Sequence, residues 1–172
     1  VVVGGGPAGA TAAERLAGAG KQVVLLDRGG RIKPCGGAIP PRLIQDFAIP
    51  HDLLCARATA ARMISPSDRA VDMPIENGFV GMVNREVFDE WLRERASQRG
   101  ADRRRGVFLR IERASENDQP VVVYASEDAP ETELRIRAKV VIGADGARSQ
   151  VARDILGPAG EAPCVFAYHE LV

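Results

Sequence analysis

The opening of the chain is the feature that most constrains its fold, because an apolar run at residues 1–3 leads directly into the glycine-rich turn 4–9. An amphipathic stretch follows, and a second apolar run at residues 22–26 ends at Asp27. Strand, tight turn, helix, strand and acid come in the order of a dinucleotide-binding βαβ unit. The sequence therefore predicts a site for an adenine dinucleotide at its start.

Three spaced glycines in this turn have separate predicted tasks. Gly4 allows a sharp turn away from the strand, Gly6 leaves room for a pyrophosphate at the backbone, and Gly9 lets the helix pack closely. The helix N-terminus presents amide groups and its positive dipole to the phosphates. Asp27 is spaced to accept hydrogen bonds from ribose hydroxyls. A turn that binds no ligand is the alternative, and this motif alone does not distinguish FAD from a nicotinamide cofactor.

Composition excludes several classes of protein. The 172 residues carry 23 basic and 23 acidic side chains, so the overall charge predicts no nucleic-acid partner. Apolar runs stay far below the roughly 18 residues that a membrane span requires. Three separated cysteines without a CxxC pair, beside two histidines, predict no metal site and favour a reducing compartment. We therefore expect a cytoplasmic location.

Hydrophobic periodicity predicts the remaining elements. Residues 42–47 and 85–99 have helical spacing, and Asn84 is placed to cap the second of these helices. The buried stripe predicted for that helix is Val87, Phe88, Trp91, Leu92 and either Arg95 or Ala96. Strands are predicted at 58–64, 70–75, 79–83, 107–111, 121–124, 133–137, 140–142 and 165–172, and a last helix at 150–156. The strands from 107 to 137 resemble an antiparallel meander, and strand 140–142 is apolar enough to return to a parallel sheet.

A second motif follows strand 140–142, in the segment Gly143-Ala144-Asp145-Gly146-Ala147-Arg148-Ser149. Asp145 can accept hydrogen bonds from backbone amides, Gly146 permits close backbone approach, and Arg148 supplies positive charge. The segment resembles the second fingerprint of flavoprotein hydroxylases and reductases of the p-hydroxybenzoate hydroxylase fold. In that family this turn lies near the FAD pyrophosphate and the route used by NADPH. The alternative is that Asp145 only caps the next helix and Arg148 is solvated.

The same resemblance implies roles for two further positions. Arg85 begins a helix directly after a strand, and in this fold an arginine there reaches the flavin cofactor. A surface arginine paired with Glu86 or Asp89 is the alternative. The backbone near Leu109 would flank the adenosine end of FAD.

Shorter segments are similar to the geranylgeranyl reductase family, and within it to the branch that makes chlorophyll and bacteriochlorophyll. They are Pro34-Cys35-Gly36-Gly37-Ala38-Ile39-Pro40, Met63-Ile64-Ser65-Pro66-Ser67, Ala70-Val71-Asp72 and Gly81-Met82-Val83-Asn84-Arg85-Glu86. The resemblance implies an FAD-dependent oxidoreductase that acts on CH–CH groups and uses NADPH to reduce a geranylgeranyl chain to phytyl. A (bacterio)chlorophyllide of photosynthesis or a diphosphate would carry that chain.

Cys35 is the predicted catalytic residue, because it is the only side chain of the PCGG loop that can donate a proton. It would relay a proton to the alkene or position it against the flavin; a small buried thiol that packs the loop is the alternative. The cofactor-binding residues that we predict are Gly4, Gly6, Ala8, Gly9, Asp27, Arg28, Cys35, Gly36, Ala38, Arg85, Leu109, Asp145 and Gly146.

The predicted fold class is α/β: an FAD-binding Rossmann-like domain of the p-hydroxybenzoate hydroxylase type with an inserted antiparallel β substrate layer. Residues 1–57 and 84–164 would form the FAD/NAD(P)-binding domain, and residues 58–83 and 165–172 the start of a β-rich substrate domain. Because Val1 already lies in the first strand, we expect an N-terminal fragment of a longer chain. The resemblance implies that a later Gly-Asp segment for the flavin ribityl follows Val172.

The predicted partners are a prenylated pigment or a prenyl diphosphate, with peripheral contact to the photosynthetic membrane. The run Arg103-Arg104-Arg105 is predicted to form a solvated strand edge, with anionic lipid as its alternative contact. Two other functions stay open. An aromatic-ring flavin monooxygenase shares both fingerprints but lacks the PCGG loop, and a non-catalytic prenyl-binding escort protein would have a degraded phosphate turn.

Overall fold

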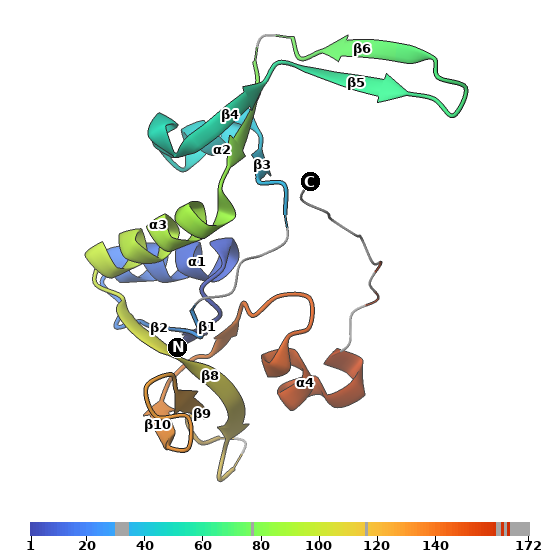
Figure 1. Ribbon diagram of the computed structural model, residues 1–172. Coiled ribbons are helices and arrows are strands. Elements are labelled where there is room, and N and C mark those ends of the chain that lie inside the picture. Colours follow the sequence, from blue (N-terminus) through green and yellow to red (C-terminus); the bar gives the residue numbers. More distant parts are fainter. Residues whose placement is uncertain (30–34, 77, 116, 161–162, 164, 166–172) are drawn as a thin grey trace. The chain divides into compact units, whose positions relative to one another are not determined.

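The computed structural model describes residues 1–29, 35–76, 78–115, 117–160, 163 and 165 (Figure 1). The chain divides into two compact units. The first comprises residues 1–31 and 89–168, and the second comprises residues 32–88 and 169–172. The division falls inside helix α3 (Arg85–Gln98).

A six-stranded sheet forms the centre of the first unit. Its strands are β1 (Val2–Val3), β2 (Val24–Asp27), β8 (Asp102–Glu112), β9 (Val121–Ser126), β10 (Glu133–Arg137) and β11 (Ile142–Gly143). They are arranged in the order β10-β9-β8-β2-β1-β11. The pairs β8–β2, β2–β1 and β1–β11 are parallel, whereas β8–β9 and β9–β10 are antiparallel. The predicted α/β class, with a parallel sheet and an antiparallel meander, is confirmed.

Strand β8 belongs to both parts of this sheet. Its first residues, from Asp102 to Arg105, pair in parallel with β2, and from Gly106 onward it pairs antiparallel with β9. Among the described pairings, Arg103, Arg104 and Arg105 pair with β2 alone, and the side chains of Arg104 and Arg105 are 42% and 62% exposed, which agrees with the predicted solvated strand edge. The first residues of this strand were not predicted, because three consecutive arginines are not typical of a strand. In the structure a carboxylate neutralises one of them: Glu90 pairs with Arg103, whose side chain is only 17% exposed.

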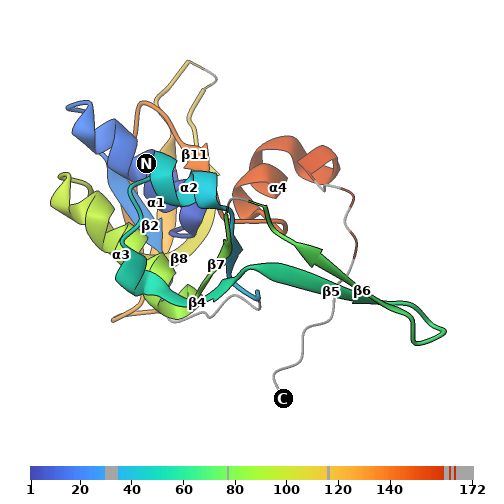
Figure 2. The same cartoon turned by 90° about the horizontal axis from the view of Figure 1, so that it is seen from above.

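Helix α1 (Pro7–Gly18) packs on β1 and β2. Pro7 occupies its first turn as predicted, and its buried face includes the small residues Gly9, Ala10, Ala13 and Ala17. Small side chains let a helix backbone approach its neighbours closely. Helices α1 and α3 lie side by side in both views (Figures 1 and 2).

Helix α3 begins after Asn84, whose Oδ1 accepts a hydrogen bond from the Glu86 amide at 3.0 Å. Phe88, Leu92 and Ala96 recur at a spacing of four residues and are buried, as predicted. Val87 was expected in the same stripe, but its side chain is 53% exposed. The prediction for Val87 is wrong because this position lies outside the face that the four-residue spacing defines.

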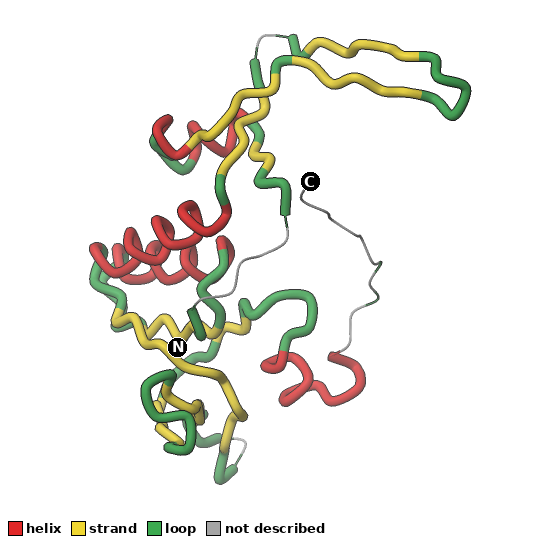
Figure 3. Tube along the Cα trace, viewed as in Figure 1, coloured by secondary structure: helices red, strands yellow, loops and turns green. Residues whose placement is uncertain are grey.

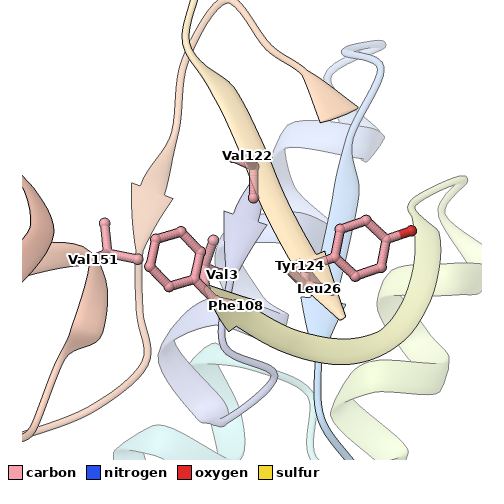
Figure 4. Packing of buried hydrophobic residues seen from close by; sticks show 6 residues of the cluster. All are labelled: Val3, Leu26, Phe108, Val122, Tyr124 and Val151. Carbon is pink, nitrogen blue, oxygen red and sulfur yellow. The ribbon is translucent and has the colours of Figure 1, made fainter. Parts of the chain in front are cut away.

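The core on the other face of the sheet is a cluster of six buried side chains (Figure 4). They come from β1, β2, β8, β9 and helix α4 (Gln150–Leu156): Val3, Leu26, Phe108, Val122, Tyr124 and Val151. Each such burial contributes roughly 1.5–3 kcal/mol of transfer free energy. The cluster therefore packs α4 and the antiparallel strands β8 and β9 against β1 and β2, the strands next to the glycine turn. A short 3₁₀ turn, Gly157–Gly160, follows α4.

The second unit is made of short elements (Figure 3). They are β3 (Ala38–Ile39), α2 (Pro41–Asp46), a 3₁₀ turn (His51–Leu53), β4 (Leu54–Ala58), β5 (Ala60–Ile64), β6 (Ala70–Pro74) and β7 (Val80–Val83). One sheet has the order β3-β7-β4, and β5 pairs with β6. Strand β4 was not predicted, because its sequence LCARA has no apolar alternation. Residues 166–172 of the predicted strand 165–172 lie outside the described residues.

Candidate functional site

The carboxyl ends of β1 and β11 lie side by side where the strand order changes direction. From β1 the chain continues to β2 and β8 on one side of the sheet, and it returns to β11 on the other. The Ala144 amide donates to the Val3 carbonyl at 2.7 Å, and the Gly4 amide donates to the Leu26 carbonyl at 2.8 Å. Open parallel sheets bind ligands outside such a switch point. Both predicted motifs thus occupy the position where a ligand is expected.

Gly4 brings these two motifs into contact. Its φ is +104°, a backbone conformation that residues with a side chain rarely adopt. A Cβ atom on Gly4 would lie 2.8 Å from the Cα of Asp145 and would overlap the Ala144 carbonyl. Both the turn and its contact with the second motif therefore require glycine at this position.

Packing requires glycine at position 9 but not at position 6. A Cβ atom on Gly9 would overlap the Gly4 carbonyl oxygen and lie 3.1 Å from the Cβ of Ala144, so α1 packs closely against the turn as predicted. A Cβ atom on Gly6 would meet none of the described atoms within 4 Å, and its φ of −73° suits any residue. Neither packing nor backbone conformation explains glycine at position 6, whereas a ligand that approaches the backbone does.

The N-terminus of α1 follows directly from Gly6. No side chain in the described part of the chain caps this 12-residue helix, and Pro7 and Ala8 are exposed in its first turn. The amide groups of a first helical turn have no partners within the helix, and the helix dipole adds positive potential there. Such a terminus suits a phosphate group.

Asp27, at the end of β2, is bonded to the glycine turn. Its Oδ1 accepts from the Gly5 amide at 3.0 Å, and its Oδ2 lies 3.4 Å from Nη1 of Arg93. The same Nη1 donates to the Gly5 carbonyl at 3.1 Å. A Cβ atom on Gly5 would lie 2.6 Å from the carboxyl carbon of Asp27, so this contact requires glycine at position 5. The Asp27 side chain remains 18% exposed.

Glu90 and Arg103 hold Arg93 in this position. Glu90 lies 2.9 Å from Arg93 and accepts two hydrogen bonds from Arg103, at 2.6 and 2.8 Å. The Arg103 bonds, with help from Arg93, lower the pKa of Glu90 from 4.5 to about 2. Glu90 is therefore ionised throughout the physiological range, and the four charges of Asp27, Glu90, Arg93 and Arg103 balance.

Asp145 and Ser149 together cap helix α4: Ser149 is the N-cap residue, and its Oγ accepts from the Ala152 amide at 2.9 Å. The Oδ2 of Asp145 accepts from the amides of Gln150 and Val151 at 2.6 and 3.2 Å, and its Oδ1 accepts from the Ser149 hydroxyl at 2.5 Å. The capping interpretation of Asp145 is confirmed. The role of Asp145 and Gly146 beside a phosphate stays a prediction, with Gly146 exposed at a φ of +91°.

Four of the predicted site residues lie in the second unit. Cys35 is exposed, so the alternative of a buried thiol is wrong. A Cβ atom on Gly37 would overlap the Val83 carbonyl, and the Val83 amide donates to the Gly37 carbonyl at 2.9 Å. This contact brings the segment of Cys35, Gly36 and Ala38 to the end of β7, two residues before Arg85. A Cβ atom on Gly36 would meet none of the described atoms within 4 Å.

The remaining predicted residues lie in the first unit. Leu109 is 40% exposed at a bulge of β8, where the pairing with β9 shifts between Phe108 and Arg110. Arg28 is exposed directly after β2. Their contacts with a cofactor stay predictions.

Sequence reasoning missed Gly5, Glu90, Arg93 and Arg103. Arg93 reaches Gly5 across 88 positions of the chain, and no local pattern signals such a contact. The spacing of Glu90 and Arg93 by three residues indicates a helical ion pair, but it gives no reason to connect that pair with the glycine turn.

The residues at the switch point fit a flavin dinucleotide. Gly6 and the uncapped N-terminus of α1 suit its pyrophosphate, and the Asp27 carboxylate suits its adenosine ribose. Among the described residues, no three His, Cys, Asp or Glu side chains gather as metal ligands. Within that same part of the chain, none of the helices combines the length and apolar character that crossing a membrane demands.

Comparisons with known proteins agree with this geometry. Residues 49–163 match the family described as FAD binding domain, and residues 2–61 match the family described as NAD(P)-binding Rossmann-like domain. These matches support FAD and NAD(P)H as cofactors.

Individual relatives point to one branch of these proteins. The chain is 62% identical over 171 residues to a geranylgeranyl diphosphate reductase of Rhodobacter capsulatus, covering 99% of this chain and 42% of that protein. It is 41% identical over 180 residues to a chloroplastic geranylgeranyl diphosphate reductase of Arabidopsis thaliana, covering 99% of this chain and 38% of that protein. The solved structure of a geranylgeranyl bacteriochlorophyll reductase-like protein of Thermoplasma acidophilum matches with a TM-score of 0.81 and 25% identity, over 94% of this chain and 42% of that one.

The chain spans less than half the length of each of these relatives. The predicted resemblance to the geranylgeranyl reductases is confirmed, as is the predicted FAD-binding Rossmann-like fold.

Proposed function

The chain belongs to the FAD-binding domain family, and from this premise we propose that the protein is an FAD-dependent reductase of geranylgeranyl chains with NADPH as the electron donor. The observation that carries the proposal is Gly6, a glycine at the switch point that neither packing nor backbone conformation requires. It leaves the backbone accessible to a pyrophosphate. The identity of 62% to a protein named geranylgeranyl diphosphate reductase supports this substrate class.

The substrate in this proposal is a geranylgeranyl group carried by a (bacterio)chlorophyllide or by a diphosphate, which becomes phytyl. Two relatives are named for the diphosphate, and the name of a structural neighbour includes bacteriochlorophyll. Because a prenylated pigment is held in a membrane, the proposal includes a cytoplasmic protein that touches the photosynthetic membrane at its periphery. The proposal includes no nucleic-acid partner, because the numbers of basic and acidic side chains are equal.

The chain's own residues have separate tasks in this reaction. When bound, FAD supplies the hydride that NADPH provides. Gly6 and the first turn of α1 hold the pyrophosphate, and Asp27 accepts from the adenosine ribose. Arg85 contributes positive charge toward the cofactor from the start of α3.

Cys35 is the proposed proton donor. An isolated alkene accepts hydride at its more substituted carbon only if a proton reaches the other carbon. The Cys35 Sγ would give that proton and recover it from solvent, which its exposure permits. One C=C bond, one hydride and one proton give one saturated CH–CH unit.

The direct test of the function uses the full-length protein. We expect it to purify with a flavin spectrum, and the reduced flavin to be reoxidised by geranylgeranylated pigment or geranylgeranyl diphosphate without oxygen. Oxygen consumption with a hydroxylated product would instead indicate an aromatic-ring monooxygenase. A protein that binds prenyl substrate without turnover or flavin would indicate an escort protein.

The test of Cys35 is a comparison of two cysteines in the same unit. Cys35→Ala and Cys35→Ser should lower turnover at unchanged FAD content. Cys55→Ala is the matched control, because Cys55 is also exposed and donates to the Met82 carbonyl at 3.1 Å. Wild-type turnover in both Cys35 variants would contradict the catalytic role.

A further inference from the structure

Arg93 is the side chain that ties Asp27 to the glycine turn. It contacts the Asp27 carboxylate at 3.4 Å and the Gly5 carbonyl at 3.1 Å through one nitrogen, Nη1. Asp27 in turn accepts from the Gly5 amide at 3.0 Å. Gly5 therefore has its carbonyl held by Arg93 and its amide held by Asp27.

The arginine itself has little freedom. Its side chain is 14% exposed, and its Nε and Nη2 both face Glu90, at 3.0 and 2.9 Å. Arg103 fixes Glu90 in turn from strand β8. A guanidinium held at both ends is a rigid support, because its nitrogen atoms lie in one plane.

This arrangement determines what the Asp27 carboxylate can offer. Oδ1 is engaged by the Gly5 amide, while Oδ2 has only the longer contact to Arg93 in the described structure. A carboxylate oxygen has more than one acceptor site, so Oδ2 can still accept from a hydroxyl. Arg93 holds the carboxylate in one orientation and offsets its charge.

We propose that Arg93 is a positioning residue for the adenosine ribose: it holds Asp27 so that the carboxylate accepts from the ribose hydroxyls of FAD. The inference rests on the proposed FAD site and adds to it a residue that touches no cofactor atom. It identifies the pair of helix α3 and strand β8, through Glu90 and Arg103, as the support of that subsite.

The experiment measures the affinity of the full-length apoprotein for two ligands: FAD, and the FAD analogue whose adenosine ribose lacks both hydroxyl groups. Arg93→Met should weaken FAD binding about tenfold. It should change the affinity for the analogue by less than about twofold, since the analogue has no ribose hydroxyl for Asp27 to hold. Arg93→Lys should lie between wild type and Arg93→Met, because a lysine keeps the charge but loses the planar fork.

Two controls separate this effect from a general loss of structure. Arg99→Met removes another arginine of α3, whose partner is Glu14 at 3.6 Å, and should leave both affinities unchanged. Asp27→Asn should reduce the preference for FAD over the analogue, as Arg93→Met does. If Arg93→Met is too unstable to purify, the same comparison is made with Arg93→Lys.

An equal loss for FAD and its analogue would overturn the inference, because Arg93 would then act on the Gly5 peptide or on the fold alone. Unchanged FAD affinity in Arg93→Met beside a loss in Asp27→Asn would also overturn it and leave the proposed function intact. Failure of the wild-type protein to bind FAD would remove the proposed function and this inference together.

Discussion

Gly9 lies so close to the carbonyl oxygen of Gly4 that no side chain fits between helix α1 and the turn before it. Gly4 makes an equally close contact with Ala144 and Asp145 of the second motif. Helix, turn and second motif are thus packed through glycines, and the site at the switch point depends on backbone contacts that a single methyl group would disrupt.

Gly9→Ala should destabilise the apoprotein by roughly 3 kcal/mol, because the new Cβ would have to displace backbone. Gly18→Ala is the matched control in the same helix, since a Cβ there would meet none of the described atoms within 4 Å. That control should be neutral or stabilise by up to about 1 kcal/mol. Urea unfolding of both variants checks this, and similar free energies of unfolding would contradict the packing argument.

Glu90 should make stability fall in acid. Folding lowers its pKa from 4.5 to about 2, chiefly through the hydrogen bonds from Arg103. The stabilisation is therefore fully present above the unfolded pKa and is lost as the pH falls through the folded one. Because the side chain is 47% exposed, we discount it for solvent screening to an effect on the order of 1 kcal/mol.

Urea unfolding at several values between pH 7 and pH 2 measures this contribution. Glu90→Gln should flatten the decrease in the acidic window, whereas Glu86→Gln, an exposed residue of the same helix, should leave it unchanged. Identical pH profiles for wild type and Glu90→Gln would show that the ion pair does not stabilise the fold.

Asp145 should be needed for the start of helix α4. Asp145→Ala removes the acceptor of the Gln150, Val151 and Ser149 donors, and should cost about 1–2 kcal/mol. Asp145→Asn keeps one acceptor oxygen and should cost less. Arg148→Ala, at an exposed position of the same turn, should stay within about 0.5 kcal/mol of wild type. Equal effects of Asp145→Ala and Arg148→Ala in urea unfolding would contradict the capping role.

The parts of the fold that could be predicted depend on local patterns. Gly4, Gly6, Gly9 and Asp27 are spaced along one βαβ unit, and the spacing alone places Gly4 and Asp27 at the ends of neighbouring strands and Gly6 and Gly9 at the start of the helix. Helix α4 begins at Gln150 and ends at Leu156, as periodicity predicted.

The parts that could not be predicted depend on contacts between distant segments. Arg103 is only 17% exposed because Glu90, from the preceding helix, pairs with it. Arg93 contacts Gly5 because helix α3 packs next to the turn, 88 positions away in the chain. A sequence pattern predicts that a charged side chain is exposed unless an oppositely charged partner lies nearby in the chain. The partners of Arg93 and Arg103 at this site include residues 88 and 13 positions away.

The central claim is that position 6 is glycine because the flavin pyrophosphate approaches the backbone there. The most direct measurement is the FAD affinity of Gly6→Ala in the full-length protein, together with the free energy of unfolding of its apo form. We predict apo stability within about 1 kcal/mol of wild type, because the Cβ meets open space, and FAD affinity lowered at least about tenfold. Wild-type affinity in Gly6→Ala would contradict the account.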